Sequence, residues 1–153
     1  MLKAVLFDLD GTLLPMDLEE FQKSYFSSLA KFLAPYGYEP EKLVKDVWTG
    51  IKAMMKNDGT KSNEKAFWTV FASIYGEDAV EDEKLFKEYY INHFHVNKKV
   101  CGFDEDAKSI VDKVKAMGLR TALATSPIFP LIATSQRVSW AGLSENDFVK
   151  KSL

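Results

Sequence analysis

Residues 5–14 read VLFDLDGTLL, an apolar stretch that runs into two aspartates one residue apart and then into Gly-Thr. Residues 3–8 predict a β-strand that is apolar on both faces, which is typical of a central parallel strand covered by helices on each side. Because side chains alternate along an extended chain, Asp8 and Asp10 are expected on the same side. They would lie at the carboxyl edge of a sheet, where open α/β folds bind their ligands.

Two carboxylates this close repel each other unless a cation lies between them. Oxygen donors suit a hard divalent ion, most simply Mg²⁺, so Asp8 and Asp10 are both candidate metal ligands. An acidic turn that merely closes a buried strand is the structural alternative, but the order of the acids and the Gly11-Thr12 that follows favour a site. An EF-hand calcium loop is excluded because its remaining ligands are missing.

The pattern Asp8-x-Asp10-x-Thr12 resembles the first motif of the haloacid dehalogenase-like (HAD) hydrolases. The resemblance is strong at residues 3–14 and 100–127, and is architectural between them. It implies that Asp8 is a nucleophile that forms an aspartyl-phosphate. It also implies that Asp10 serves first as the general acid and then as the general base. Family members that cleave carbon–halogen bonds lack the second acid, so Asp10 indicates phosphoryl transfer.

Residues 119–127 read LRTALATSP, an apolar strand that ends in hydroxyl groups. This stretch resembles the second motif of the family, which implies that Thr125 hydrogen-bonds the phosphoryl group. Ser126 and the amides that follow it are expected to help, because a helix N-terminus after the strand donates N–H groups to an anion. Gly11 is also among the expected phosphate-binding residues. Thr-Ser-Pro is also an ordinary helix start, so the assignment depends on its order relative to the two aspartates.

The residues between these motifs predict four amphipathic helices, from their helical spacing of apolar residues. The helices are expected at residues 17–36, at 40–57, between Ser62 and Gly76, and at 82–94. Residues 16–99 hold fifteen of the twenty aromatic residues, enough for a core of their own. The resemblance implies that this segment is a C1-type cap over the active site.

The expected fold class is therefore α/β. A partial Rossmann-like parallel sheet core, residues 1–15 and 100–153, would carry an inserted all-helical cap, residues 16–99. Within the core, a helix is expected from residues 104–106 to Gly118 and another from Ile132 to Trp140. Phe148-Val149 is expected to begin a third strand.

The family also carries a catalytic Lys and a later acidic motif, and neither is recognisable here. Lys150 and Lys151 follow the presumed third strand too closely to supply the Lys, and Glu145 and Asp147 lie in a loop. Residues 3–7 would then present an open apolar edge, through which the chain is expected to self-associate. We therefore expect either a piece of a longer hydrolase, with weak or no turnover by these 153 residues, or a short form completed by another chain.

Composition excludes several other functions. A net charge of −2 and a pI near 5.7 give no broad positive field for nucleic acid. No apolar run has the length of a membrane span, and the N-terminus predicts a strand rather than a signal peptide. The lone Cys101 cannot form an internal disulfide, so we expect a half-buried structural thiol and a cytoplasmic protein. His93 and His95 lie two apart on a predicted helix and do not face each other, which argues against a metal site.

The sequence thus favours a Mg²⁺-dependent phosphatase that acts on a small phosphorylated metabolite, without a nucleic-acid or membrane partner. Two alternatives stay open. The first is a non-catalytic partial HAD fold that binds a phosphate ligand or a partner chain. The second is a phosphomutase, which shares the same first motif.

Overall fold

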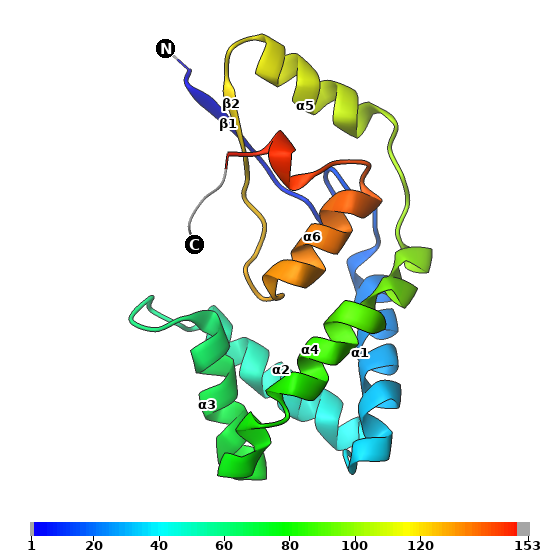
Figure 1. Cartoon of the computed structure of the whole chain (residues 1–153), viewed down its shortest axis with the longest axis vertical. Coiled ribbons are helices and arrows are strands. Elements are labelled where there is room, and N and C mark those ends of the chain that lie inside the picture. The colour runs from blue at the N-terminus through cyan, green and yellow to red at the C-terminus, as the bar shows by residue number, and fades with distance from the viewer. Residues whose placement is uncertain (1, 150–153) are drawn as a thin grey trace. The chain divides into compact units, whose positions relative to one another are not determined.

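The computed structural model describes residues 2–149, in which two strands and six α-helices occur (Figure 1). Their order is β1 (Ala4–Phe7), α1 (Leu18–Leu33), α2 (Pro40–Met55), α3 (Asn63–Tyr75), α4 (Glu83–Asn92), α5 (Asp106–Ala116), β2 (Arg120–Leu123) and α6 (Leu131–Trp140). The chain forms two compact units. The core unit comprises the described parts of residues 1–24, 97–126 and 131–153, and the helical unit comprises residues 25–96 and 127–130.

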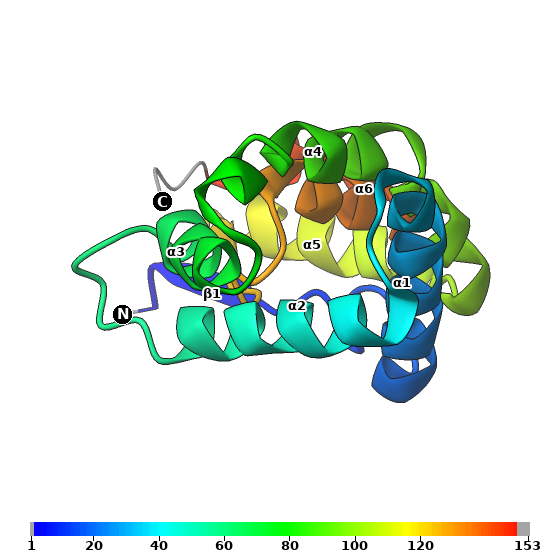
Figure 2. The same cartoon turned by 90° about the horizontal axis from the view of Figure 1, so that it is seen from below.

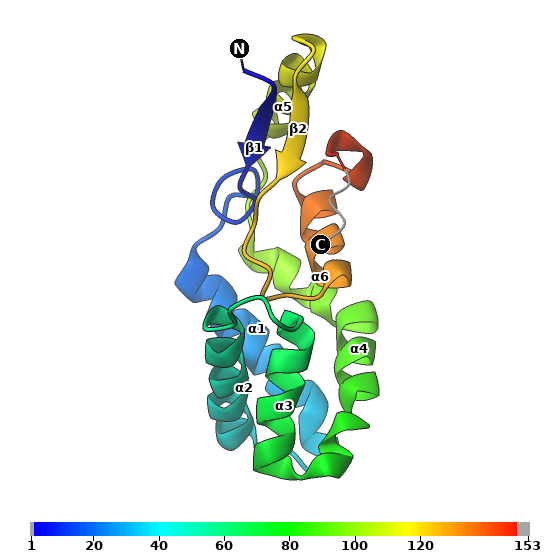
Figure 3. The ribbon, with the colours of Figure 1, turned by 90° about the vertical axis from the view of Figure 1, so that its left-hand side faces the viewer.

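The core unit is built on a parallel pair of strands. β1 and β2 lie side by side (Figure 3), and their register runs from Ala4 opposite Arg120 to Phe7 opposite Leu123. Helix α5 packs against β2 and brings the chain back to the start of that strand. Parallel strands need such a crossover, because the chain must return to the same end of the sheet. The predicted mixed α/β fold class with a small parallel sheet is confirmed.

Two expectations about the sheet are wrong for the described residues. β1 is not covered on both faces, because the side chain of Leu6 is 60% exposed and Leu2, just before the strand, is 66% exposed. Phe148 and Val149 do not form a strand, although the Val149 amide donates a hydrogen bond to the Thr121 carbonyl (2.7 Å). Lys150 and Lys151 lie outside the described residues.

The segment after α6 is held to the core by Asp147, which is buried. One carboxylate oxygen of Asp147 accepts hydrogen bonds from the amide and hydroxyl of Ser144, and the other forms ion pairs with Lys108 and Lys115. Burial alone would raise the pKa of Asp147, but the Ser144 hydrogen bond and the two lysines outweigh it and lower the pKa to about 2. Asp147 therefore has a structural role in this loop.

In the helical unit, α2 and α3 pack against each other (Figure 2). Rings of α3 pack among themselves and against Phe86 of α4. The hydroxyl of Ser62 accepts a hydrogen bond from the Lys65 amide and caps α3, as the sequence predicts. Gly50 of α2 lies directly against the ring of Phe67, and a Cβ atom there would come within 2.5 Å of it. The side chains that are fully or almost fully buried here include Leu29, Leu33, Leu43, Val47, Phe71, Tyr89 and Phe94.

The segments of the core unit that lead to and from the helical unit are paired with each other. Met16 and Cys101 form an antiparallel bridge, and the Gly102 amide donates to the Pro15 carbonyl (2.7 Å). This pairing joins two parts of the core unit that lie about 85 residues apart in the sequence. None of the helices in residues 2–149 combines the length and the apolar character that a bilayer span requires.

Candidate functional site at the end of strand β1

A tight loop follows β1 and separates the environments of the two aspartates. The Leu14 amide donates to the Leu9 carbonyl, and the Gly11 amide donates to the Leu14 carbonyl, each at 2.9 Å. Gly11 has a φ of 78°, a left-handed conformation that glycine adopts without steric cost. Leu9 is fully buried and anchors the loop. The loop leaves Asp8 exposed and turns Asp10 inward.

Asp8, the expected nucleophile, accepts a hydrogen bond from the hydroxyl of Thr12 (3.3 Å). The two residues are the first and last of the Asp-x-Asp-x-Thr pattern, and the loop brings their side chains together. A carboxylate that is exposed and held by a neighbouring hydroxyl is accessible to a substrate.

Asp10 forms an ion pair with Arg137 of α6, a residue that the sequence analysis did not predict at the site. Arg137 is fully buried, whereas the Asp10 side chain is 21% exposed. Nη1 of Arg137 donates to Oδ2 of Asp10, Nε to the Ala133 carbonyl (3.3 Å) and Nη2 to the Thr134 hydroxyl (3.3 Å). The other oxygen, Oδ1 of Asp10, is buried and has no hydrogen-bond partner among the residues that the structure describes.

Burial raises the pKa of Asp10, Arg137 opposes this shift, and the Asp8 carboxylate adds to it. The same region affects Cys101, because burial and then the Asp10 carboxylate raise the pKa of this thiol to about 11. The Cys101 thiol also donates a weak hydrogen bond to the Asn97 carbonyl (3.7 Å). A thiol with so high a pKa is protonated at neutral pH and is a poor nucleophile.

The predicted phosphate-binding residues follow β2. The Ala124 amide donates to the Phe7 carbonyl (2.7 Å), so the pairing continues one residue past the end of β2. Thr125 is half-buried and Ser126 is exposed. Both therefore follow β2 at the edge of the sheet where Asp8 follows β1. Their role in binding phosphate stays a prediction.

Residues 2–149 contain no cluster of three or more His, Cys, Asp or Glu side chains that could hold a metal ion. Mg²⁺ does not require such a cluster, because it commonly binds through one or two carboxylates together with substrate phosphate and water. The exposed carboxylate of Asp8 and the unpartnered Oδ1 of Asp10 supply hard oxygen donors of this kind. The donor chemistry therefore fits Mg²⁺.

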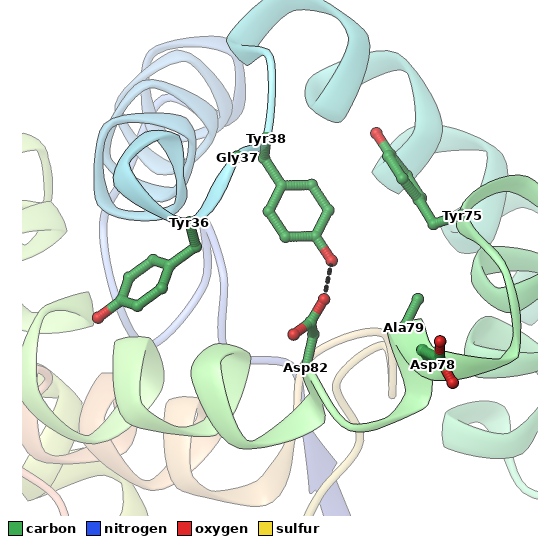
Figure 4. Close-up of a pocket in the computed structure, with 7 residues that line it drawn as sticks. All are labelled: Tyr36, Gly37, Tyr38, Tyr75, Asp78, Ala79 and Asp82. Carbon is green, nitrogen blue, oxygen red and sulfur yellow. Dashed lines mark hydrogen bonds between the residues drawn. The ribbon is translucent and has the colours of Figure 1, made fainter.

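A separate cavity of about 310 Å³ lies within the helical unit (Figure 4). The hydroxyl of Tyr38 donates to the carboxylate of Asp82 at its wall (2.5 Å). The lining residues are Tyr36, Gly37, Tyr38, Tyr75, Asp78, Ala79 and Asp82. Carboxylates without a lining cation repel a phosphate ester, so this cavity does not suit the phosphoryl group.

Comparison with known protein families decides the classification. Residues 5–133 match the family described as haloacid dehalogenase-like hydrolase. The chain belongs to this family. A comparison with curated proteins finds no match. The matched range includes both aspartates of the first motif and the hydroxyls after β2, whereas Arg137 lies just beyond it.

The sequence carried one signal for Arg137. Ala133, four residues before Arg137 in α6, and Ala141, just past the end of the helix, are both buried, so Arg137 lies on the buried stripe of the helix. A charged residue on such a stripe needs a buried partner of opposite charge. The sequence pattern does not indicate which residue pairs with Arg137, because Asp10 lies 127 residues away in the chain.

Proposed function

We propose that this HAD-like hydrolase is a Mg²⁺-dependent phosphatase that acts on a small phosphorylated metabolite. The observation that carries the proposal is the different setting of the two motif aspartates. Asp8 is exposed and contacts only a hydroxyl among its described side-chain hydrogen bonds, whereas Asp10 is largely buried and held by Arg137. Two carboxyl groups in different environments suit two different roles.

In the proposed reaction, a carboxylate oxygen of Asp8 attacks phosphorus, and the bond from phosphorus to the leaving oxygen breaks. The leaving oxygen takes a proton from Asp10, so the products of this step are an alcohol and an aspartyl-phosphate. A water molecule then gives a proton to Asp10 and attacks the phosphorus. This second step releases inorganic phosphate and restores both aspartates.

Asp8 and Asp10 would hold Mg²⁺, which neutralises negative charge on the phosphoryl oxygens when it is bound. Thr125, Ser126 and the Gly11 loop would donate hydrogen bonds to the phosphoryl group. The helical unit would act as the cap that selects the substrate. The single free thiol, Cys101, suits a reducing compartment, so we propose a cytoplasmic location.

The test combines hydrolysis with binding of a phosphoryl mimic, so that it does not depend on fast turnover. We expect Mg²⁺-dependent release of phosphate from p-nitrophenyl phosphate, and Mg²⁺-dependent binding of beryllium fluoride observed by ¹⁹F NMR. Asp8→Asn should abolish both, whereas Asp10→Asn should mainly abolish hydrolysis. Asp58→Asn, in an exposed turn of the helical unit, is the matched control. Absence of both hydrolysis and fluoride binding in the wild-type chain would contradict the proposal.

A second candidate function is association with another chain through the free edge of β1. The observation that favours it is the exposure of Leu6 on β1, and of Leu2 just before it, because β1 has one neighbour, β2, within residues 2–149. Sedimentation equilibrium should then give a mass above that of the monomer, and Leu6→Lys should restore the monomer. Leu18→Lys, at an exposed position of α1, is the control and should leave the mass unchanged.

A further inference from the structure

The guanidinium of Arg137 is fixed from three sides. Its three nitrogens donate to three different acceptors, which are the Asp10 carboxylate, the Ala133 carbonyl and the Thr134 hydroxyl. Two of these acceptors belong to the preceding turn of α6 itself. The side chain is also fully buried, so it cannot exchange these contacts for water. The helix therefore holds two of the three guanidinium nitrogens independently of Asp10.

The two carboxylate oxygens of Asp10 are in different situations. Oδ2 accepts from Arg137, while Oδ1 is buried without a hydrogen-bond partner among the described residues. Leaving a buried acceptor unsatisfied is unfavourable, and such atoms in native structures usually indicate a missing ligand or water. A half-turn of the carboxylate exchanges two equivalent oxygens, so one oxygen faces Arg137 and the other stays unpartnered in either case, whereas the fixed guanidinium opposes smaller rotations.

We propose that Arg137 is a positioning residue that holds the Asp10 carboxyl group in one orientation, with one oxygen on the guanidinium and the other left free for a ligand of the site. This inference rests on the proposed function for the role of Asp10, and it adds a residue outside the range that matches the family. Lysine could not replace this arrangement fully, because its ammonium lacks the planar fork that reaches three acceptors at fixed angles.

The first experiment measures how firmly the Asp10 side chain is held about χ1, the torsion that carries its carboxyl group, and needs no turnover. Three-bond couplings from the Asp10 side-chain carbon to its backbone nitrogen and carbonyl carbon report χ1 by NMR. We expect values of a single rotamer in the wild-type chain, rotamer averaging in Arg137→Met, and partial averaging in Arg137→Lys. Arg120→Met is the matched control, because Arg120 is exposed on β2. Averaged couplings in the wild type, or a single rotamer retained in Arg137→Met, would overturn the proposal.

The second experiment separates positioning from a merely structural role through the leaving group. Loss of a positioned general acid should slow hydrolysis of an alkyl phosphate by about 100-fold. The same variant should slow p-nitrophenyl phosphate much less, because nitrophenolate leaves without a proton. We expect this selective loss in the kcat of Arg137→Met, with a nearly unchanged KM and partial rescue in Arg137→Lys. An equal loss for both substrates would overturn the proposal.

The two experiments distinguish the possible failures. If the wild-type chain hydrolyses neither substrate and does not bind beryllium fluoride, the proposed function fails, and the NMR couplings still decide whether Arg137 orients Asp10. If Arg137→Met does not fold, Arg137→Lys decides instead. A lysine variant with the wild-type rotamer and the wild-type preference between leaving groups would show that the three contacts of Arg137 are unnecessary.

Discussion

The hydroxyl of Thr121, on β2, donates a hydrogen bond to the main-chain carbonyl of Asp147, and the Thr121 carbonyl accepts one from the Val149 amide. A single buried residue of the strand thus holds the segment that follows α6 at two points. The side chain of Asp147 adds the ion pairs with Lys108 and Lys115. This group of contacts joins β2, α5 and the end of the described chain.

We expect Thr121→Val to lower the free energy of unfolding by about 1–3 kcal/mol, because the substitution keeps the shape of the side chain and leaves the Asp147 carbonyl without its donor. Urea denaturation followed by circular dichroism measures this loss. Thr121→Ser keeps the hydroxyl and should lose less stability than the valine variant. Equal stability of the valine variant and the wild type would mean that the hydrogen bond is unimportant.

The stability of the core unit should depend on pH through the ionisation of Asp147. Its folded pKa, about 2, lies below the value near 3.9 expected in the unfolded chain. The ionised carboxylate therefore stabilises the fold fully above about pH 4, and this contribution is lost as the pH falls toward 2. Asp147→Asn should have a lower Tm at pH 7 than the wild type, and the difference should shrink below pH 4. A difference in Tm that is independent of pH would contradict this assignment.

The Asp10–Arg137 pair should show strong coupling in a double-mutant cycle. Removing one partner of a buried ion pair leaves an uncompensated charge and costs about 3–5 kcal/mol, and Arg137→Met is expected near the lower end because Asp10 is partly exposed. Asp10→Asn combined with Arg137→Met should be more stable than the sum of the single losses predicts. Arg120→Met should change stability by less than about 0.5 kcal/mol. Additive losses in the double variant would show that the pair does not interact.

The pKa of the Cys101 thiol, and with it the alkylation rate, should depend on the charge of Asp10. Its pKa of about 11 predicts slow alkylation by iodoacetamide at pH 8 and a rate that rises until about pH 11. Asp10→Asn removes a negative charge and should lower the pKa of the thiol, whereas Arg137→Met removes a positive charge and should raise it further. Alkylation rates measured against pH, with the product identified by mass spectrometry, give both shifts. A wild-type rate that levels off near pH 8.5 would contradict the assignment.

Gly50→Ala should destabilise the helical unit although alanine favours helix formation by about 1 kcal/mol over glycine. The new Cβ would lie 2.5 Å from the ring of Phe67, and such overpacking typically costs about 1–3 kcal/mol. Thermal unfolding measures the effect. Phe67→Leu in the same chain removes the clashing ring atoms and should make the alanine substitution less costly. A higher Tm for Gly50→Ala alone would show that the ring moves aside freely.

The sequence predicted those parts of the fold that depend on local patterns. Ser62 caps α3, and helix α6 covers almost the predicted residues, because capping and helical periodicity are local properties. The family was also predictable, because residues 5–14 carry its first motif without interruption. The expected roles of Asp8, Asp10, Gly11, Thr125 and Ser126 stay predictions.

Features that depend on distant partners could not be predicted in the same way. Whether Leu6 is exposed depends on which segments cover β1. The apolar residues of the strand indicate only that coverage by other segments would be favourable. Phe148 and Val149 have the composition of a strand, but within the described residues they make only one hydrogen bond to β2. Arg137 meets Asp10 only because the fold brings α6 to the loop after β1.

The register of β1 with β2 joins residues from near the beginning of the chain to residues beyond the long segment 25–96 of the helical unit. Closing so long a loop lowers the conformational entropy of the chain before the strand contacts form and offset this cost. Helix contacts join near neighbours in the sequence and therefore form early. During refolding, the helices between the strands should therefore acquire structure first, and the sheet that carries Asp8 should assemble last.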